Sequence, residues 1–497
     1  MERFFFVVML CALALSGVKA QETFDEYKRR KDAEYSNYVT NKNKEYEDFR
    51  KRINQEYAAM VEKSWQEFKA MQPIPKPKDE PPIPPIVFPE EDKDKTLEDN
   101  PKPIEEVVPI DEPEPQPEPV VPIEDTPTPS ADKWFTFIYC NTSMKVRLED
   151  KNKFHLTSSE EKQVAQAWNK LSSSAYNSLI NDCLTLRSTH QLCDWAYLCM
   201  LHDLSQAYYG RACNEATLLT AFLFCQSGYK MRLASTDDGI LIMLFASHHK
   251  IYNVGYFELD GIYYYPFDNN SSQMRICSAS FPKEKPLSLQ INREQSLATR
   301  QSELRTLVSY RYPDMKVTVR TNENLMLFYD TYPSSEIGEN FCSRWALYAN
   351  APLSNQARTM LYPTLQRAIQ NKTKLEAVNR LLNFVQTAFV YEYDDKVWGC
   401  DRAFFADETL YYPYCDCEDR SILFSRLVRD LVGLDVVLIY YPGHLATAVA
   451  FPEGVKGDYI VLGNTRYIIC DPTYIGAPVG ATMPKMNNSQ AKAILLE

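Results

Sequence analysis

The stretch that decides the fold of the C-terminal part of the chain is residues 415–451, which read CDCEDRSILFSRLVRDLVGLDVVLIYYPGHLATAVAF. Apolar residues in its first half recur at the spacing of one helix face, at Ile422, Leu423, Leu427 and Leu431. Its second half holds two apolar runs, 436–440 and 446–451, separated by a Pro-Gly pair. We therefore predict a helix over 418–431, followed by two strands joined by a turn.

A cysteine stands at the start of this predicted helix. The exposed N–H groups and the dipole of a helix N-terminus lower the pKa of a thiol, so Cys417 is well placed for thiolate chemistry. Three acidic neighbours oppose that effect: Asp416, Glu418 and Asp419. A base must therefore supply most of the activation.

One histidine and one aspartate downstream complete a set of groups for thiol chemistry. His444 is the only histidine in the last 248 residues and precedes a strand of small residues. Asp471 directly follows an apolar run at 467–470. A nucleophile, a base and a group that orients the base are the three parts of such a site, here Cys417, His444 and Asp471.

Three short motifs around these residues occur in the order found in a known superfamily. Residues 416–420 (DCEDR), 442–444 (PGH) and 471–473 (DPT) resemble the cysteine, histidine and aspartate motifs of transglutaminase-like proteins, over roughly residues 375–485. The resemblance implies a papain-like α+β fold, with Cys417 as nucleophile, His444 as base and Asp471 as its orienting partner. It also implies cleavage or transfer of amide bonds in a peptide or protein substrate through a thioester.

Two further expectations follow from the resemblance. An oxyanion donor is expected upstream of the cysteine, and Gln386 and Trp398 are the candidates. Members of the superfamily often carry an aromatic residue shortly after the histidine, whereas this chain has Leu445 and Ala446. The acyl-acceptor side of the site is therefore left open.

An earlier stretch repeats the order of these elements. Cys213 opens an apolar run, a strand then leads to His249, and a further strand ends near Asp268. We predict a duplicated module in which Cys213, His249 and Asp268 correspond to the triad. The first copy is expected to be degenerate, because residues 214–216 (NEA) replace Glu-Asp-Arg and no Asp-Pro-Thr follows.

The first twenty residues predict export. Arg3 is followed by an apolar run over 4–15, and small residues at 18–20 (VKA) precede Gln21. The run is short for a membrane span, although an uncleaved anchor is the alternative. No later stretch is long and apolar enough for a stable span, so we expect a periplasmic or extracellular protein.

The cysteine pattern leaves a structural role for Cys417 open. Of the 13 cysteines, twelve follow the predicted signal peptide, and an oxidising compartment permits disulfides. In the alternative interpretation, Cys417 is half of a disulfide with Cys415 or Cys400, or an inert buried thiol. No spacing fits a zinc site, and we expect neither a metal nor a cofactor.

Residues 24–71 carry an eleven-residue repeat. Aromatic residues recur every eleventh position, at Phe24, Tyr35, Tyr46, Tyr57 and Phe68. Eleven residues over three turns keep this stripe on one face of a helix. We predict a long helix over 21–72, which either stands alone in solvent, self-associates through residues 24–71 or docks on another surface.

Residues 73–131 are acidic and rich in proline. They hold eighteen of the 31 prolines, and their sixteen acidic residues and five lysines account for −11 of the net charge of −12. The rest of the chain has no basic field, so nucleic-acid binding is not expected. We predict a disordered, extended linker without a core.

The remaining sequence is typical of an α+β fold, because helices and strands come in blocks. We expect residues 132–350 to form the degenerate module with extra strands, and residues 351–497 to form the catalytic domain, each a helical lobe with an antiparallel sheet. Helices are expected at 160–180, 192–209, 214–225, 355–369, 374–386 and 418–431. Strands are expected at 240–245, 252–259, 262–265, 316–320, 325–329, 436–440, 446–451 and 467–470.

Two classes of function remain at this point. The first is an exported thiol enzyme that acts on amide bonds, more a peptidase than a crosslinking enzyme. The second is a non-catalytic binding or scaffold protein that uses transglutaminase-like folds and an oligomerising helix. A Cys417→Ala variant that keeps partner binding, together with a lack of any turnover, would favour the second.

Overall fold

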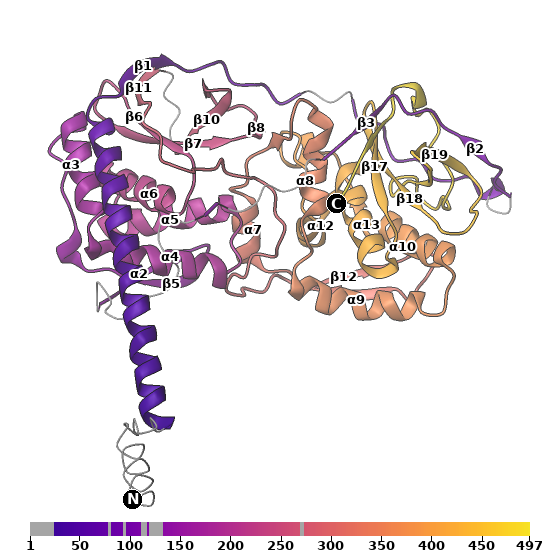
Figure 1. Ribbon diagram of the computed structural model, residues 1–497. Coiled ribbons are helices and arrows are strands. Elements are labelled where there is room, and N and C mark those ends of the chain that lie inside the picture. Colours follow the sequence, from indigo (N-terminus) through magenta and orange to yellow (C-terminus); the bar gives the residue numbers. More distant parts are fainter. Residues whose placement is uncertain (1–23, 78–80, 93–95, 111–116, 119–132, 269–272) are drawn as a thin grey trace, which may run out of the picture.

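The computed structural model describes residues 24–77, 81–92, 96–110, 117–118, 133–268 and 273–497. The predicted signal peptide lies outside these residues. The described chain is α+β, as predicted, with curled antiparallel sheets and helices in two lobes that lie side by side (Figure 1). Among the described helices, none has both the length and the apolar composition that a bilayer crossing requires.

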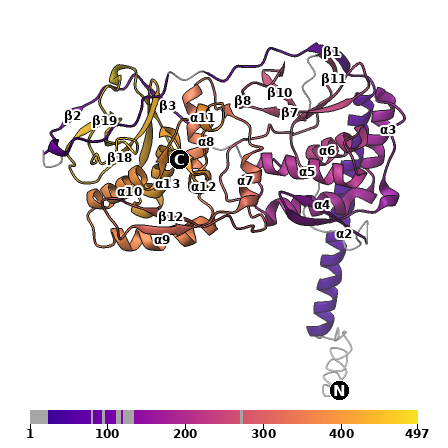
Figure 2. The ribbon, with the colours of Figure 1, turned by 180° about the vertical axis from the view of Figure 1, so that it is seen from behind.

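The first element is a long helix that is only half packed. Helix α2 (Phe24–Val61) buries Tyr57 and Val61 against the first lobe, where the Nε1 of Trp168 donates to the Oδ1 of Asn54 at 2.9 Å. Its N-terminal half projects away from the molecule, and Tyr35 there is 67% exposed (Figures 1 and 2). The aromatic stripe therefore serves docking on the chain's own first lobe at one end and faces solvent at the other.

The helix predicted over 21–72 is too long at its C-terminal end. Strand β1 (Trp65–Lys69) follows α2 and pairs antiparallel with β11 (Gln273–Cys277). Pairing at a sheet edge satisfies the backbone and lets Trp65 and Phe68 pack partly against the lobe. Tertiary pairing thus overrides the helical repeat in its last unit.

The first lobe places four helices against a sheet. The helices are α3 (Glu161–Leu171), α4 (Asn177–Thr189), α5 (Asp194–Tyr209) and α6 (Asn214–Gln226). The strands are β4 (Trp134–Tyr139) and β5 (Thr142–Arg147) in a hairpin, and β6 (Met231–Ser235), β7 (Leu241–Ser247), β9 (Phe257–Leu259), β10 (Ile262–Pro266) and β11 in the sheet. The predicted helix 160–180 is in fact two helices, separated by a 3₁₀ turn at Ser174–Tyr176.

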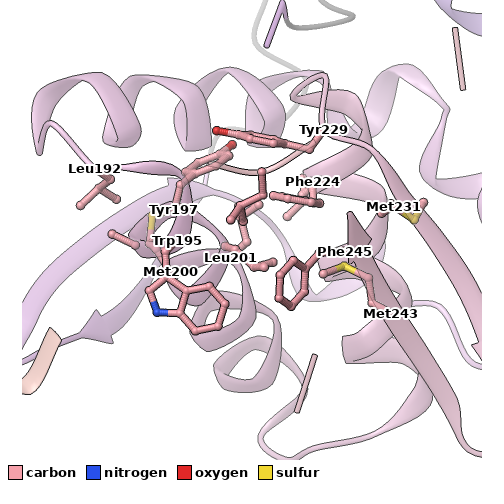
Figure 3. Close-up of a cluster of buried hydrophobic side chains, with 14 of the residues drawn as sticks. Leu192, Trp195, Tyr197, Met200, Leu201, Phe224, Tyr229, Met231, Met243 and Phe245 are labelled. Atoms are coloured by element: carbon pink, nitrogen blue, oxygen red, sulfur yellow. The ribbon is translucent and has the colours of Figure 1, made fainter. Parts of the chain in front are cut away.

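The core of this lobe lies between α5, α6, β6 and β7 (Figure 3). The rings of Phe224 and Tyr229 stack with centroids 4.3 Å apart, and Trp195 meets Phe245 edge-on. Such pairs add specific geometry to the burial of apolar area. The core fixes α6, and therefore Cys213 at its start, against the sheet.

The second lobe contains the residues of the predicted triad. Its helices are α9 (Asn355–Ile369), α10 (Lys374–Ala388), α11 (Asp394–Val397), α12 (Ala406–Tyr411) and α13 (Cys417–Val432). Its strands are β12 (Arg305–Val308), β13 (Lys316–Val319), β15 (Val390–Tyr391), β16 (Tyr414–Cys415), β17 (Val436–Tyr441), β18 (His444–Ala450), β19 (Asp458–Leu462), β20 (Thr465–Cys470) and β21 (Lys492–Ile494). The β12–β13 hairpin shares an apolar core with α9 and α10, so this lobe draws on residues before 351.

Two helices and a small strand pair connect the lobes. They are α7 (Glu323–Tyr329), α8 (Arg344–Asn350), β8 (Lys250–Ile251) and β14 (Ser335–Glu336). The strand predicted at 325–329 is wrong, because this segment is helix α7. The side chain of Asn322 accepts a hydrogen bond from the N–H of Asn324, which starts a helix at a point where the apolar run alone suggested a strand.

The two main sheets repeat one strand order. The first reads β11-β6-β7-β10-β9 and the second reads β21-β17-β18-β20-β19, and every neighbouring pair in both is antiparallel. In both lobes a helix, α6 or α13, precedes the first of these strands and packs on the sheet. This order makes β6 the counterpart of β17, β7 that of β18 and β10 that of β20.

Much of the acidic, proline-rich segment is built into the second lobe. Strand β2 (Asn100–Pro101) pairs parallel with β19, and β3 (Glu106–Val108) pairs parallel with β21, so the segment extends both edges of the sheet. The ring of Phe88 is buried and packs edge-on against Tyr474 with centroids 5.3 Å apart. The prediction of a linker without a core is therefore wrong for these residues, because apolar side chains between the prolines pack on the lobe and edge strands tolerate proline.

Candidate active site

Cys417 is the first residue of α13, and the backbone around it is tightly held. The side chain of Asp416 accepts hydrogen bonds from the N–H groups of Glu418 and Asp419, and the N–H of Asp416 donates to Asp419 at 3.1 Å. This reciprocal arrangement is a capping box, which satisfies N–H groups at the helix start. The position of the thiol is therefore fixed by the cap.

His444 and Asp471 are in contact. The Nε2 of His444 lies 2.9 Å from the Oδ2 of Asp471, and both side chains are buried. The other oxygen of Asp471 accepts the N–H groups of Thr473 and Tyr474, at 2.8 and 3.2 Å. The Nδ1 of His444 has no hydrogen-bond partner although it is buried. The ring is thus oriented through one nitrogen and presents the other.

A single cavity brings the thiol and the histidine together. It measures about 690 Å³, and both Cys417 and His444 line it. Aromatic residues form part of its wall: Trp345, Tyr393 and Tyr440. The cavity therefore combines a thiol, an oriented imidazole with an unpartnered nitrogen, and enclosed space, which are the parts that nucleophilic catalysis would use.

The local field disfavours the thiolate. Burial, and then the charges of Asp416 and Glu418, hold the pKa of the Cys417 thiol well above its ordinary value. The backbone N–H of Leu445 acts in the opposite direction and lowers that pKa. The surroundings therefore favour the neutral thiol over the thiolate, in the direction that the acidic neighbours in the sequence indicate.

Several buried carboxyl groups surround the thiol. Burial and mutual repulsion raise the pKa values of Asp416, Glu418 and Asp419, and they raise that of Asp394 to about 7. Asp401 differs: although burial opposes it, Lys76 and Arg344 lower the pKa of its carboxyl. The site is acidic, and Lys76 and Arg344 form their ion pairs with Asp401. Lys76 and Arg402 also lower the pKa of Asp394, and Arg344 that of Glu418, but less than burial and repulsion raise them.

Two sets of these side chains could hold a cation. Asp394, Asp401 and Glu418 bring ligand atoms to within 4.8 Å of one another, and so do Asp416, Cys417 and Glu418. Three carboxylate oxygens suit a hard cation such as Ca²⁺. Asp401, however, already bears the ammonium of Lys76 and lies 3.7 Å from Arg344.

Neither predicted oxyanion donor lies in the cavity wall. The amide of Gln386 is buried and donates to three carbonyl oxygens, those of Asp471, Tyr474 and Ala477. It therefore holds the loop that carries Asp471. Trp398 packs against the rings of Phe404 and Tyr412 and beneath Arg402. The placement of these two side chains therefore gives no support to either candidate.

The predicted first-lobe triad is not assembled. His249 is buried, and its Nε2 accepts the N–H of Leu289 at 3.2 Å. Cys213 and Asp268 line a separate cavity of about 300 Å³, to which His249 does not contribute. The histidine in that cavity is His202 of α5, with its Nε2 3.4 Å from the Oδ2 of Asp268.

The mismatch arises from a shift of one strand. The order of elements in the sequence predicts that the strand before His249, which is β7, corresponds to the strand before His444, which is β17. The sheet order instead makes β7 the counterpart of β18. Strand β18 begins with His444, whereas the residue just before its counterpart β7 is Ile240. The first lobe has an apolar residue at the position of the base.

The alternative interpretation of Cys417 as half of a disulfide finds no support. Throughout the described parts of the chain the cysteines are free thiols, including Cys400, Cys415 and Cys417. Cys400 is exposed and lines the same cavity as Cys417.

Sequence reasoning missed the cationic and aromatic members of the site. Lys76, Arg344 and Trp345 lie far from the motif in sequence, Tyr393 lies within the stretch of the resemblance, and no local pattern marks any of them. Only the fold brings them to Cys417. No family model matches this chain, and neither a curated protein nor a solved structure is significantly similar to it.

Proposed function

We propose that this protein is an exported, transglutaminase-like thiol enzyme that cleaves amide bonds through a thioester on Cys417. One observation carries the proposal: the buried His444–Asp471 pair leaves the Nδ1 of His444 without a partner in the cavity that holds the Cys417 thiol. An oriented imidazole with an unpartnered nitrogen, in the same cavity as the thiol, supports its role as the base that activates a nucleophile.

The chemistry follows from the placement of the groups. The thiol proton of Cys417 passes to the Nδ1 of His444, and the sulfur attacks the carbonyl carbon of the amide. Collapse of the tetrahedral adduct breaks the C–N bond while the imidazolium gives its proton to the leaving amine. Water, deprotonated by His444, then attacks the thioester and releases a carboxylic acid and the thiol.

Asp471 is expected to stabilise the imidazolium and to fix the ring. Its second oxygen is held by two backbone N–H groups, and Gln386 holds its loop through three carbonyl groups. The carboxylate thus cannot turn away when the charge develops. Leu445, whose N–H favours the thiolate, is a candidate donor near the reacting atoms.

Hydrolysis is favoured over crosslinking as the outcome. A peptide mixture incubated with the protein, with and without an added primary amine, separates the two when products are identified by mass spectrometry. New carboxyl termini indicate a peptidase, and amine adducts indicate transfer. Cys417→Ala should abolish either product and keep the circular-dichroism spectrum, whereas unchanged turnover in this variant would contradict the proposal.

A second candidate is a non-catalytic binding protein. The observation in its favour is the raised pKa of the Cys417 thiol, which suits a buried structural cysteine as well as a resting nucleophile. Under this alternative, Cys417 forms no covalent adduct with any acyl donor in mass spectra of the intact protein. A trapped adduct on Cys417 rejects it.

A further inference from the structure

The cavity that holds Cys417 is acidic on one side and aromatic on the other. Its wall contains five carboxyl groups: Asp394, Asp395, Asp401, Asp416 and Glu418. Among the described residues of the wall, Lys76 is the one lysine or arginine, and its ammonium is bound to Asp401. Its charge also acts to lower the pKa of Asp394, but it forms no ion pair there, and the described residues of the wall supply no second cation.

Glu418 shows that this side of the cavity is incomplete. The residue is 6% exposed, its side chain hydrogen-bonds that of Asp401, and its Oε1 has no hydrogen-bond partner. A buried carboxyl oxygen without a partner costs free energy, and proteins normally complete such a group with a donor or a cation. Glu418 lines the cavity beside Cys417, so a bound molecule can supply the missing donor.

The chain already places one ammonium group in this cavity. The Nζ of Lys76 donates to the backbone oxygen of Asp401 at 2.7 Å and pairs with its carboxylate. The cavity therefore has the width and the polarity to accept a lysine side chain. Rings of Trp345, Tyr393 and Tyr440 add faces and edges that suit an organic cation.

Charge distribution favours an organic ammonium over a divalent metal. Lys76 and Arg344 both act on Asp401, which is one of the three carboxylates closest to one another. Their positive charges would repel a divalent ion bound to the same group. An ammonium of single charge, bound between Asp394 and Glu418, needs no ligand from Asp401.

We propose that Asp394 and Glu418 form a subsite for a primary ammonium group of the substrate, so that the protein acts on peptides carrying a lysine-type side chain or a free amino terminus near the attacked amide. The inference rests on the proposed attack by Cys417. It also gives the acidic wall a role in catalysis. A positive charge entering the subsite offsets the carboxylates that disfavour the thiolate, so the correct substrate promotes ionisation of its own nucleophile.

The test uses charged thiol reagents on the full-length protein and does not need turnover. Cationic aminoethyl methanethiosulfonate and anionic sulfonatoethyl methanethiosulfonate modify thiols, and peptide mapping by mass spectrometry gives the rate at each cysteine. Cys417 and the exposed Cys400 both report on the cavity. At each cysteine, the ratio of the rate with the cationic reagent to the rate with the anionic reagent cancels differences in thiolate fraction.

In the wild type we expect the cationic reagent to react about tenfold faster or more at these two cysteines. Asp394→Asn with Glu418→Gln should bring the ratio close to that of a solvent-exposed thiol. Asp435→Asn with Glu453→Gln removes the same charge from two exposed positions at the far end of the sheet and should leave the ratio unchanged. If the double cavity variant does not fold, Asp395→Asn, an exposed member of the wall, should still lower the ratio measurably.

Protection by short peptides identifies the source of the ammonium. An acetylated peptide with lysine, the same peptide with norleucine, and an unacetylated neutral peptide are compared for slowing of the labelling. Protection by the first or the third, and not by the norleucine peptide, supports the subsite and names its ligand. Equal protection by all three, no charge preference in labelling, or protection by calcium chloride alone overturns the inference.

These outcomes separate the inference from the proposed function. A charge preference without any peptide turnover would leave the subsite standing and reject the enzyme. Turnover of neutral peptides with no charge preference in labelling would support the proposed enzyme and reject the subsite.

Discussion

The two lobes have the same sheet and different chemistry. In both, a helix that starts at or beside a cysteine packs on strands in one order, and an aspartate follows the counterpart strands β10 and β20. In the second lobe His444 opens β18 and reaches Asp471. In the first, Ile240 precedes β7, and His202 comes from a helix instead. The topology is therefore shared, while the residue at the start of the counterpart strands differs: a histidine in the second lobe and an apolar residue in the first.

The lobes also differ in how they hold their aspartate. Asp471 is buried, and two backbone N–H groups and the Gln386 amide fix its loop. Asp268 has positive φ, and its side chain is mostly exposed. An orienting carboxylate must be rigid to hold an imidazole. The comparison therefore predicts that catalysis is confined to the second lobe.

The largest effect is expected from the two cysteines. Cys417→Ala should lower kcat/KM by at least about a thousandfold, since the nucleophile is lost. Cys213→Ala should change it less than about twofold. Steady-state turnover of a peptide substrate checks both, with thermal unfolding as the control for folding. A comparable loss in the two variants would remove the distinction between the lobes.

The two aspartates give the next test. Asp471→Asn keeps the shape and removes the charge that stabilises the imidazolium, so kcat should fall about a hundredfold or more. Asp268→Asn should leave kcat unchanged. Rates measured over a range of pH show whether the loss follows the histidine. If Asp268→Asn lowers kcat more than Asp471→Asn does, the assignment of catalysis to the second lobe is wrong.

Gln386 tests whether the second lobe depends on the loop that carries Asp471. Gln386→Leu leaves three carbonyl oxygens and the N–H of Gly476 without their buried partner. The free energy of unfolding should fall by about 3 kcal/mol, given about 1–3 kcal/mol for each unsatisfied buried group and partial relaxation. Urea denaturation measures it. Asn379→Leu, which loses a bond to the same region through Val479, is the milder control.

A buried carboxyl of the second lobe should make the stability of the protein depend on pH. Burial raises the pKa of Glu408 in the second lobe to about 7 from 4.5, although Arg402 opposes the shift. A carboxyl whose pKa is higher in the folded state binds its proton more tightly there, so its contribution is full below 4.5 and is lost as the pH rises through about 7. Thermal unfolding between these pH values should show this loss, and Glu408→Gln should flatten the curve. An unchanged slope in the variant would contradict the assignment.

The smallest effect is expected on the free half of α2. Replacing Tyr27, Tyr35 and Tyr38 with serine should change the free energy of unfolding by less than about 0.5 kcal/mol, because all three are exposed. Tyr57→Ala on the docked half should lower it by about 3–5 kcal/mol. Sedimentation of the triple variant and the wild type also tests the predicted self-association. If the protein self-associates through these side chains, the variant should sediment as a smaller species than the wild type.

The sequence predicted the central elements of the second lobe because their signals are local. Helix α13 and strands β17, β18 and β20 lie within about one contiguous stretch and follow from its periodicity, and Cys417, His444 and Asp471, which stay a predicted triad, lie in the same stretch. The sequence failed where partners are distant. The edge strands β2 and β3, the roles of Lys76 and Gln386, and the end of α2 at Val61 all depend on contacts with remote residues. His249 was misassigned because strand β6 was overlooked, which moved the comparison by one strand.

The edge strands from the acidic segment set an order of events in folding. The amide of Asn100 bonds to Asp458, a partner 358 residues later in the chain. At about 5–20 residues per second, the ribosome completes these 358 residues roughly 20–70 s after it has made Asn100. For that time the segment is an edge strand with nothing to pair with, which is the state in which chains aggregate. Its prolines and its acidic residues suppress such pairing. The composition that made the segment look like a mere spacer thus protects it until its sheet exists.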